Sequence, residues 1–283
     1  MPCLGPMTEP VGWPGNHGGG QMSRTVLYRC RRVALVASLC GAVLAIGTLT
    51  QTSASAVTTI PAFYTVPAHI PSTAGAIIKY QRISAPGVDA AATYRIMYVS
   101  KTVANKPVAV TGLIFVPFAK APAGGYPVVS WGHGTDGMAD VCAPSLQPSS
   151  AVPEINLLLQ QGWVVTASDY QGLGTPGLLP YLVGEVAARN AVDIVRAAHN
   201  LKRIHASTNY VVWGHSEGGQ TAMFSLHIGA AYAPDLHLKG VVAGAPPSQF
   251  AVIYDFLKTS PYRFYLSATR PVTARSSLPS RRS

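Results

Sequence analysis

Short apolar runs alternate with longer mixed stretches through the middle of the chain. Each run ends in small or polar residues, as in YPVVSWGHG, GWVVTASDY, NYVVWGHS and LKGVVAGAPP. Continuous apolar strands separated by helical stretches are typical of a parallel sheet that is buried on both faces. The pattern therefore predicts an α/β fold with a mostly parallel central sheet flanked by helices. Ligands of such sheets bind at the carboxyl ends of the strands.

The segment before these runs has a different texture. Thr93–Thr102 and Pro107–Ala119 are rich in β-branched and aromatic residues, and a short polar turn separates them. Two such runs around a turn predict a hairpin with antiparallel strands. Prolines interrupt the chain repeatedly from Val57 to Pro86, so we expect an irregular lead-in segment there.

Helices are predicted between and after the apolar runs. The clearest begins at Leu182 and ends at Leu201, because its apolar residues recur at spacings of three and four and form one face. A second helix begins at Glu217 and runs to about Ala231. A third covers Ser248–Leu257, after the last apolar run.

The N-terminal region is typical of a secretory signal peptide. Four arginines precede an apolar run at 33–50, and Ala54-Ser55-Ala56 matches the small-x-small pattern of a cleavage site. We predict cleavage near Ala56 and a secreted or envelope-associated protein, with an uncleaved anchor as the alternative. Met22 would give a signal of ordinary length, so the true start is either Met1 or Met22.

The chain divides into three predicted parts: an extension with the signal peptide (1–56), an incomplete α/β core (57–266) and an irregular basic tail (267–283). The 283 residues carry a formal net charge of +10, but much of the excess lies in the signal and the tail. No basic patch is interleaved with aromatic residues, so we do not expect a nucleic-acid partner.

The pentapeptide Gly214-His215-Ser216-Glu217-Gly218 is the strongest candidate for catalysis. It fits Gly-x-Ser-x-Gly, with an apolar strand before it and a predicted helix after it. At such a turn the serine has a strained backbone, and the flanking glycines prevent collisions across it. We predict that Ser216 is a nucleophile exposed at a helix N-terminus, where the dipole favours developing negative charge.

Two segments are candidates for an oxyanion hole. The backbone N–H of Glu217 is the first donor after the nucleophile, and its carboxylate is interpreted as an ordinary charge at a helix N-terminus. The glycine-rich loop after YPVVSWGHG offers the backbone N–H groups of Thr135 and Asp136. An ordinary connecting loop is the alternative for this second segment.

Three further polar residues near these strand ends are interpreted as structural. His215 is expected to pack beneath the turn, because adjacent residues at such an elbow point apart. His133 is expected to shape its loop. Asp169 is expected to cap a turn or support the site, because the triad acid of this fold normally follows the nucleophile.

Five ordered blocks together resemble the secretory lipase family of α/β-hydrolases, in its actinobacterial branch. They are VVSWGHGTDGMADVCAPS, GWVVTASDYQGLGTPG, PYLVGEVAARNAVDIVRAA, VVWGHSEGGQTAMF and LKGVVAGAPPSQF. The resemblance implies serine-dependent hydrolysis of carboxylic esters, with acylglycerols as substrates and no metal or organic cofactor. Ser216 matches the family nucleophile, and Asp136 and Glu217 match its oxyanion positions. Cys142 matches a cysteine expected to bond a partner later in the chain.

The acid and the histidine of a triad are not found in this sequence. The only histidines after Ser216 are His227, on the second predicted helix, and His237, which with Asp235 precedes the last apolar run. That position places His237 and Asp235 at the end of the sheet opposite the catalytic edge. In the family that this chain resembles, a helical lid and further strands follow the position that corresponds to Leu266. We therefore expect a C-terminally truncated family member, with a frame shift near Leu266 as one candidate cause.

The sequence thus favours an exported lipase or esterase that acts through an acyl-enzyme on Ser216, with transient contact to a lipid surface. A peptidase or acyltransferase on the same elbow is one alternative. A catalytically impaired fragment or lipid-binding remnant is the other, because a serine without its base is a weak nucleophile. Chain-length preference and oligomeric state do not follow from the sequence.

Overall fold

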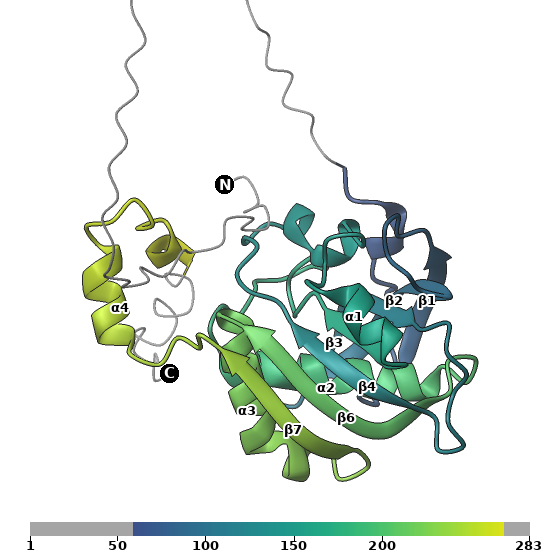
Figure 1. Cartoon of the computed structure of the whole chain (residues 1–283). Coiled ribbons are helices and arrows are strands. Elements are labelled where there is room, and N and C mark those ends of the chain that lie inside the picture. Colours follow the sequence, from purple (N-terminus) through teal and green to yellow (C-terminus); the bar gives the residue numbers. More distant parts are fainter. Residues whose placement is uncertain (1–58, 269–283) are drawn as a thin grey trace, which may run out of the picture. The chain divides into compact units, whose positions relative to one another are not determined.

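The computed structural model describes residues 59–268 of the chain (Figure 1). The predicted signal peptide, its cleavage site near Ala56, the alternative starts and the tail from 269 lie outside these residues. Within 59–268, no helix is long and apolar enough to cross a membrane.

A seven-stranded sheet forms the centre of the described part, in the order β1-β2-β3-β5-β4-β6-β7. The strands are β1 Ile77–Ile83, β2 Ala92–Lys101, β3 Pro107–Val116, β4 Tyr126–Gly132, β5 Val164–Ser168, β6 Ala206–His215 and β7 His237–Gly244. The predicted hairpin is β2 and β3, and it is antiparallel as expected.

The sheet is mixed rather than mostly parallel. β5, β4, β6 and β7 pair in parallel, whereas β1 with β2, β2 with β3 and β3 with β5 are antiparallel pairs. The predicted α/β fold is confirmed, but parallel pairing is confined to the half of the sheet that the apolar runs form. β1 also corrects the expected irregular lead-in, because Ile77–Ile83 adds a strand beside β2 despite the prolines before it.

Four α-helices connect or follow these strands: α1 Ile155–Gln160, α2 Gly184–Asn200, α3 Glu217–Tyr232 and α4 Phe250–Leu257. Three short 3₁₀ turns lie at Ala62–Tyr64, Asp140–Cys142 and Pro144–Leu146. The three predicted helices are confirmed as α2, α3 and α4, with ends shifted by two residues or fewer. Cys142 is buried and disulfide-bonded.

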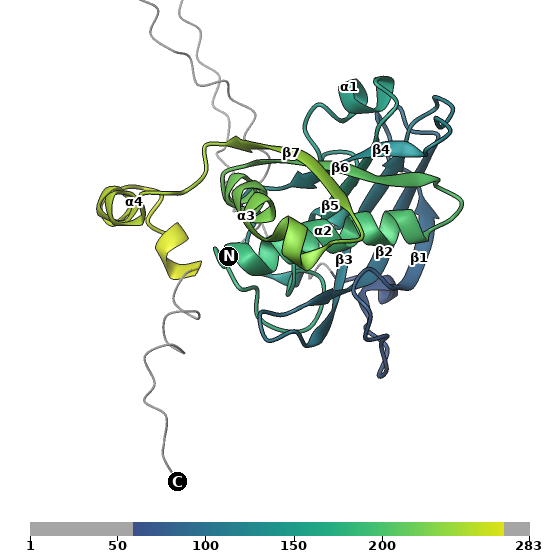
Figure 2. The same ribbon diagram turned by 90° about the horizontal axis from the view of Figure 1, so that it is seen from below.

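Helices cover both faces of the sheet (Figure 2). Alternate residues of each central strand enter different cores: Val128 packs with α2 residues, while its neighbour Val129 packs with Ile155 and Leu159 of α1. Burial of apolar side chains at about 25 cal/mol per Å² stabilises both layers. The central strands are thereby held in fixed register, and that register decides which loops meet at each end of the sheet.

Candidate active site

The carboxyl ends of the parallel strands bring the predicted site segments together. Gly132 of β4 is in register with Gly214 of β6, and His215 of β6 is in register with Gly244 of β7. Because β5 pairs in parallel with β4 on the other side, the loops that follow all four strands begin at one edge. The expectation that His133, Asp169 and Ser216 follow neighbouring strand ends is confirmed.

Ser216 occupies a strained backbone position between β6 and α3. Its φ of 57° and ψ of −120° lie outside the regions that non-glycine residues normally adopt. The Ser216 N–H donates to the carbonyl of Gly244 over 2.9 Å, and the Ser216 carbonyl accepts from Gln220 in the first turn of α3. This geometry is that of a nucleophile elbow, with the side chain held at the helix N-terminus.

The glycines around Ser216 permit backbone contacts that no side chain would allow. A Cβ atom on Gly214 would lie 2.2 Å from the carbonyl oxygen of Gly218, and one on Gly218 would lie 1.8 Å from the carbonyl oxygen of Gly132. A Cβ on Gly219 would lie 2.5 Å from the oxygen of Gly244. The sequence-based reason given for these glycines, close packing at the turn, is therefore confirmed.

His215 does not pack beneath the turn as predicted. Its side chain is exposed, next to Gly244 at the end of β7. Alternation along β6 points it away from the core residues Val212 and Gly214, toward the surface at the sheet edge. The expectation that adjacent residues at an elbow point apart did not predict the face of the sheet on which the His215 side chain lies.

The loop after β4 lies against the elbow. A Cβ on Gly134 would lie 3.7 Å from the Cβ of Ser216, which places Thr135 and Asp136 in the segment directly beside the nucleophile. Tyr170, from the loop after β5, donates its hydroxyl to the carbonyl of His133 over 3.3 Å. These contacts fix the loop from which one oxyanion donor is predicted.

His133 is buried in this loop and is not positioned as a base. Its Nδ1 lies 3.0 Å from the Asp136 carboxylate, its Nε2 lies 3.3 Å from the carbonyl of Asp169, and its ring stacks on Tyr170. Burial lowers the pKa of His133, but the hydrogen bond and charge of Asp136 raise it, with a net pKa of about 9. Both ring nitrogens are thus engaged by groups of the surrounding loops, which agrees with the predicted loop-shaping role.

Asp169 is fully buried and acts on its surroundings through hydrogen bonds. It accepts from the Thr111 hydroxyl over 2.6 Å and from both the backbone N–H and the hydroxyl of Ser145. Burial raises the pKa of Asp169, while these donors oppose the shift. Its carboxylate therefore holds the 3₁₀ turn at Pro144–Leu146 against the sheet, in keeping with the predicted supporting role.

Glu217 differs from its sequence-based interpretation. Its side chain is only 4% exposed, so it is not an ordinary solvated charge at a helix N-terminus. It accepts a hydrogen bond from the Thr135 hydroxyl over 3.0 Å, and burial raises its pKa to about 7. The tertiary contacts that bury it come from loops distant in sequence, which local spacing does not reveal.

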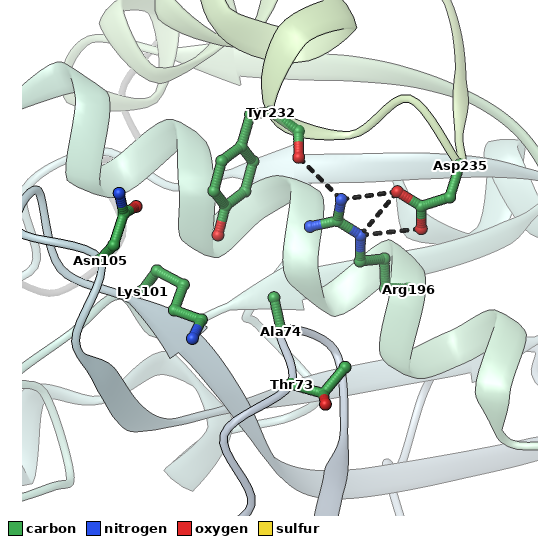
Figure 3. A pocket seen from close by; sticks show the side chains of 7 residues that line it. All are labelled: Thr73, Ala74, Lys101, Asn105, Arg196, Tyr232 and Asp235. Atoms are coloured by element: carbon green, nitrogen blue, oxygen red, sulfur yellow. Dashed lines mark hydrogen bonds and ion pairs between the residues drawn. The ribbon is translucent and has the colours of Figure 1, made fainter.

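His237 and Asp235, which follow Ser216 in the chain, lie at the opposite end of the sheet from it, as predicted. His237 is in register with Asn209 at the amino end of β6, where it contacts Thr208. Asp235 forms an ion pair with Arg196 at the same end, beside an open groove of about 480 Å³ (Figure 3). Within residues 59–268, no histidine hydrogen-bonds to the Ser216 hydroxyl.

His227 and Asp255 are also outside the site. His227 is exposed on α3, and Asp255 is exposed on α4, where it pairs with Lys258. In the part of the chain described, no cluster of His, Cys, Asp and Glu is arranged to hold a metal ion.

Known proteins resemble this chain in sequence and in fold. Residues 152–263 match the family model described as secretory lipase. Lipase A of Moesziomyces aphidis is 26% identical over 71% of this chain and 46% of its own length. A protein of Mycobacterium tuberculosis named "Probable inactive lipase MT1628" is 28% identical over 54% of this chain and 36% of its own.

A solved structure, Candida antarctica lipase A in its closed state, superposes with a TM-score of 0.60 at 24% identity. The superposed region covers 70% of this chain and 48% of the Candida antarctica lipase A chain. The chain thus spans less than half the length of each of these three proteins. The family match and the shared fold agree: residues 152–263 match the secretory lipase family, and the chain shares the α/β-hydrolase fold of the lipase structure.

Proposed function

We propose that this protein is an exported carboxylic ester hydrolase that acts on acylglycerols or similar lipid esters through an acyl-enzyme on Ser216. The observation that carries the proposal is the elbow at Ser216, whose positive φ and glycine-only contacts present one hydroxyl at the N-terminus of α3. The names of the relatives and of the matched family support lipid esters as substrates. The secretory family and the signal-like N-terminal sequence support export.

In the proposed reaction, the Ser216 oxygen attacks the ester carbonyl carbon. The backbone N–H groups of Asp136 and Glu217 donate to the oxyanion, and the alcohol leaves with a proton as the carbon–oxygen bond breaks. Water then attacks the acyl-serine and releases the carboxylic acid. The hydroxyl proton needs a base, and within residues 59–268 no histidine hydrogen-bonds to the Ser216 hydroxyl.

That observation favours a second candidate, a catalytically impaired protein that retains the elbow and a lipid-facing surface. Loss of a triad member typically leaves only about 10³–10⁴-fold assistance from binding and the oxyanion hole. The two candidates therefore differ in turnover, whereas both retain the folded elbow.

The test uses the full chain with p-nitrophenyl esters of several chain lengths, a peptide nitroanilide and a fluorophosphonate probe. We expect ester turnover and labelling of wild type, loss of both in Ser216→Ala, and no change in Ser150→Ala, a control at an exposed serine. Labelling without turnover would favour the impaired candidate, and faster release from the nitroanilide would favour a peptidase. Absence of both labelling and turnover would refute the proposed hydrolase.

A further inference from the structure

The carboxylate of Glu217 lies where three chain segments meet. Glu217 is the first residue of α3, the Thr135 hydroxyl donates to it from the loop after β4, and the backbone of Leu182 at the entry to α2 lowers the pKa of its carboxyl. The hydroxyl of Tyr181 lies 2.9 Å from the Thr135 oxygen and completes the set. Because Thr135 uses its proton on Glu217, Tyr181 is the donor in that contact.

The arrangement is unfavourable for stability in two respects. An ionised carboxylate with 4% exposure is costly to bury, and its raised pKa reflects this. Leu182 adopts a φ of 59°, a left-handed conformation that a branched apolar residue normally avoids. Glutamate is thus held at a place where its charge is poorly solvated, and the backbone of Leu182 near it is strained.

The Thr135–Glu217 contact also spans the two halves of the predicted oxyanion hole. One predicted donor is the N–H of Glu217 itself, and the other is the N–H of Asp136, the residue after Thr135. Gly134, on the other side of Thr135, approaches Ser216 closely. A hydrogen bond between Thr135 and Glu217 therefore sets the separation between the segments that carry both donors.

We propose that Glu217 is a positioning residue, whose carboxylate ties the loop at 133–136 to the start of α3 and holds the two oxyanion donors at a fixed distance. The proposal rests on the proposed function for its catalytic consequence. A hydrogen bond to an ionised acceptor is about twice as strong as one between neutral groups. Ionisation of Glu217 therefore tightens the loop, and protonation loosens it.

The titration of this contact depends on few groups. His133 and Asp136 face Glu217 from the loop after β4, Tyr170 from the loop after β5, and Tyr181 from the entry to α2. Burial raises the pKa of both tyrosines, so both remain neutral. With a Glu217 pKa of about 7 and a His133 pKa of about 9, the change near neutral pH belongs to Glu217.

The variants that test the proposal are Glu217→Gln, Thr135→Val and Thr135→Ser, each in the full chain. The first retains an acceptor but does not ionise, the second removes the hydroxyl with little change in shape, and the third restores it. Thr208→Val is the matched control, because it removes a threonine hydroxyl bonded to His237 at the other end of β6.

The first readout is the rate at which a fluorophosphonate probe labels Ser216 between pH 5.5 and 9. At pH 8 we expect Glu217→Gln and Thr135→Val to react about tenfold more slowly than wild type, with Thr135→Ser and Thr208→Val within about twofold of it. The ratio of wild type to Glu217→Gln is expected to fall toward one below pH 7. A ratio that does not vary with pH, or wild-type rates in Thr135→Val, would overturn the proposal.

The second readout is hydrogen exchange at residues 133–138, which requires no reaction. We expect faster exchange in Glu217→Gln and Thr135→Val than in wild type at pH 8, with no change in Thr208→Val. If wild type does not react with the probe, the proposed hydrolase fails, and exchange alone decides whether Glu217 holds the loop. Unchanged exchange in both variants contradicts the positioning role.

Discussion

Charged groups are buried at both ends of the parallel strands, but the partners of these charges differ between the two ends. At the amino end, the Arg196 guanidinium donates to Asp193, Asp235 and the carbonyl of Tyr232, so each of its three nitrogens has an oxygen partner. Figure 3 shows the contacts with Asp235 and Tyr232. At the carboxyl end, Glu217 is buried beside the donating Thr135 hydroxyl and has no ion pair within 4 Å in the described structure.

This difference separates a structural cluster from a site. Asp193 and Asp235 each form an ion pair with the Arg196 guanidinium, so the charges of this cluster are matched within the protein. The carboxyl end instead combines a strained serine, a strained leucine and an acid with a raised pKa, features that concentrate at functional sites. We therefore expect substitutions at the amino end to alter stability alone, and those at the carboxyl end to alter reactivity as well.

Of the substitutions at the two ends, Gly218→Ala is expected to have the largest effect on the free energy of unfolding and on the reactivity of Ser216. The added Cβ would overlap the backbone of Gly132, which no side-chain rotation relieves. We expect a loss of about 4 kcal/mol or more in the free energy of unfolding and a labelling rate at Ser216 lowered more than tenfold. Urea denaturation measures the first, with Gly240→Ala, where a Cβ meets nothing within 4 Å, as the control.

Arg196→Met tests the amino end. Removing the guanidinium leaves the Asp193 carboxylate buried without its cation, and breaking a buried ion pair in this way typically costs about 3–5 kcal/mol. We expect a loss of about 3 kcal/mol in urea unfolding with an unchanged rate of labelling at Ser216 in the remaining folded protein. A slower labelling rate in this variant would show that the two ends are coupled.

Much of this contrast was accessible from sequence, for identifiable reasons. The elbow depends on residues adjacent in the chain, so Gly214, Ser216 and Gly218 were recognised from spacing, and apolar runs placed Asp235 and His237 at the opposite end. Glu217 was interpreted as a solvated charge because its burial depends on Thr135 and Tyr181, which lie 82 and 36 positions before it. β1 was missed because prolines near it obscured a short pairing segment.

Glu217→Gln tests the carboxyl end through the pH dependence of the free energy of unfolding. The folded pKa of about 7 exceeds the value of 4.5 for an unperturbed glutamate, so the folded state binds the proton more tightly than the unfolded state. Stability from this group therefore falls as pH rises from 4.5 to 7. We expect Glu217→Gln to gain about 3 kcal/mol relative to wild type between pH 4.5 and pH 8, measured by urea unfolding at both values. A constant difference would contradict the raised pKa.

Asp235→Asn should have the smallest effect. Its carboxylate is 55% exposed, so solvent screens the pair with Arg196, and we expect a loss below about 1 kcal/mol at pH 7. Arg196 lowers the pKa of Asp235, so its contribution is present above the unfolded value and is lost as pH falls through the folded pKa. Thermal melting should show a smaller difference between Asp235→Asn and wild type at pH 3 than at pH 7.

The contact between Gly218 and Gly132 has a mechanical consequence. Two backbones that meet without intervening side chains cannot slide past each other, so the end of β4 and the first turn of α3 move as one rigid block. Space for a larger substrate at Ser216 must therefore come from movement of the outer loops, because the backbone contact between Gly218 and Gly132 does not open. Larger acyl groups should thus be accommodated by changes in the surrounding loops, with the nucleophile and its neighbouring loop kept as a fixed unit.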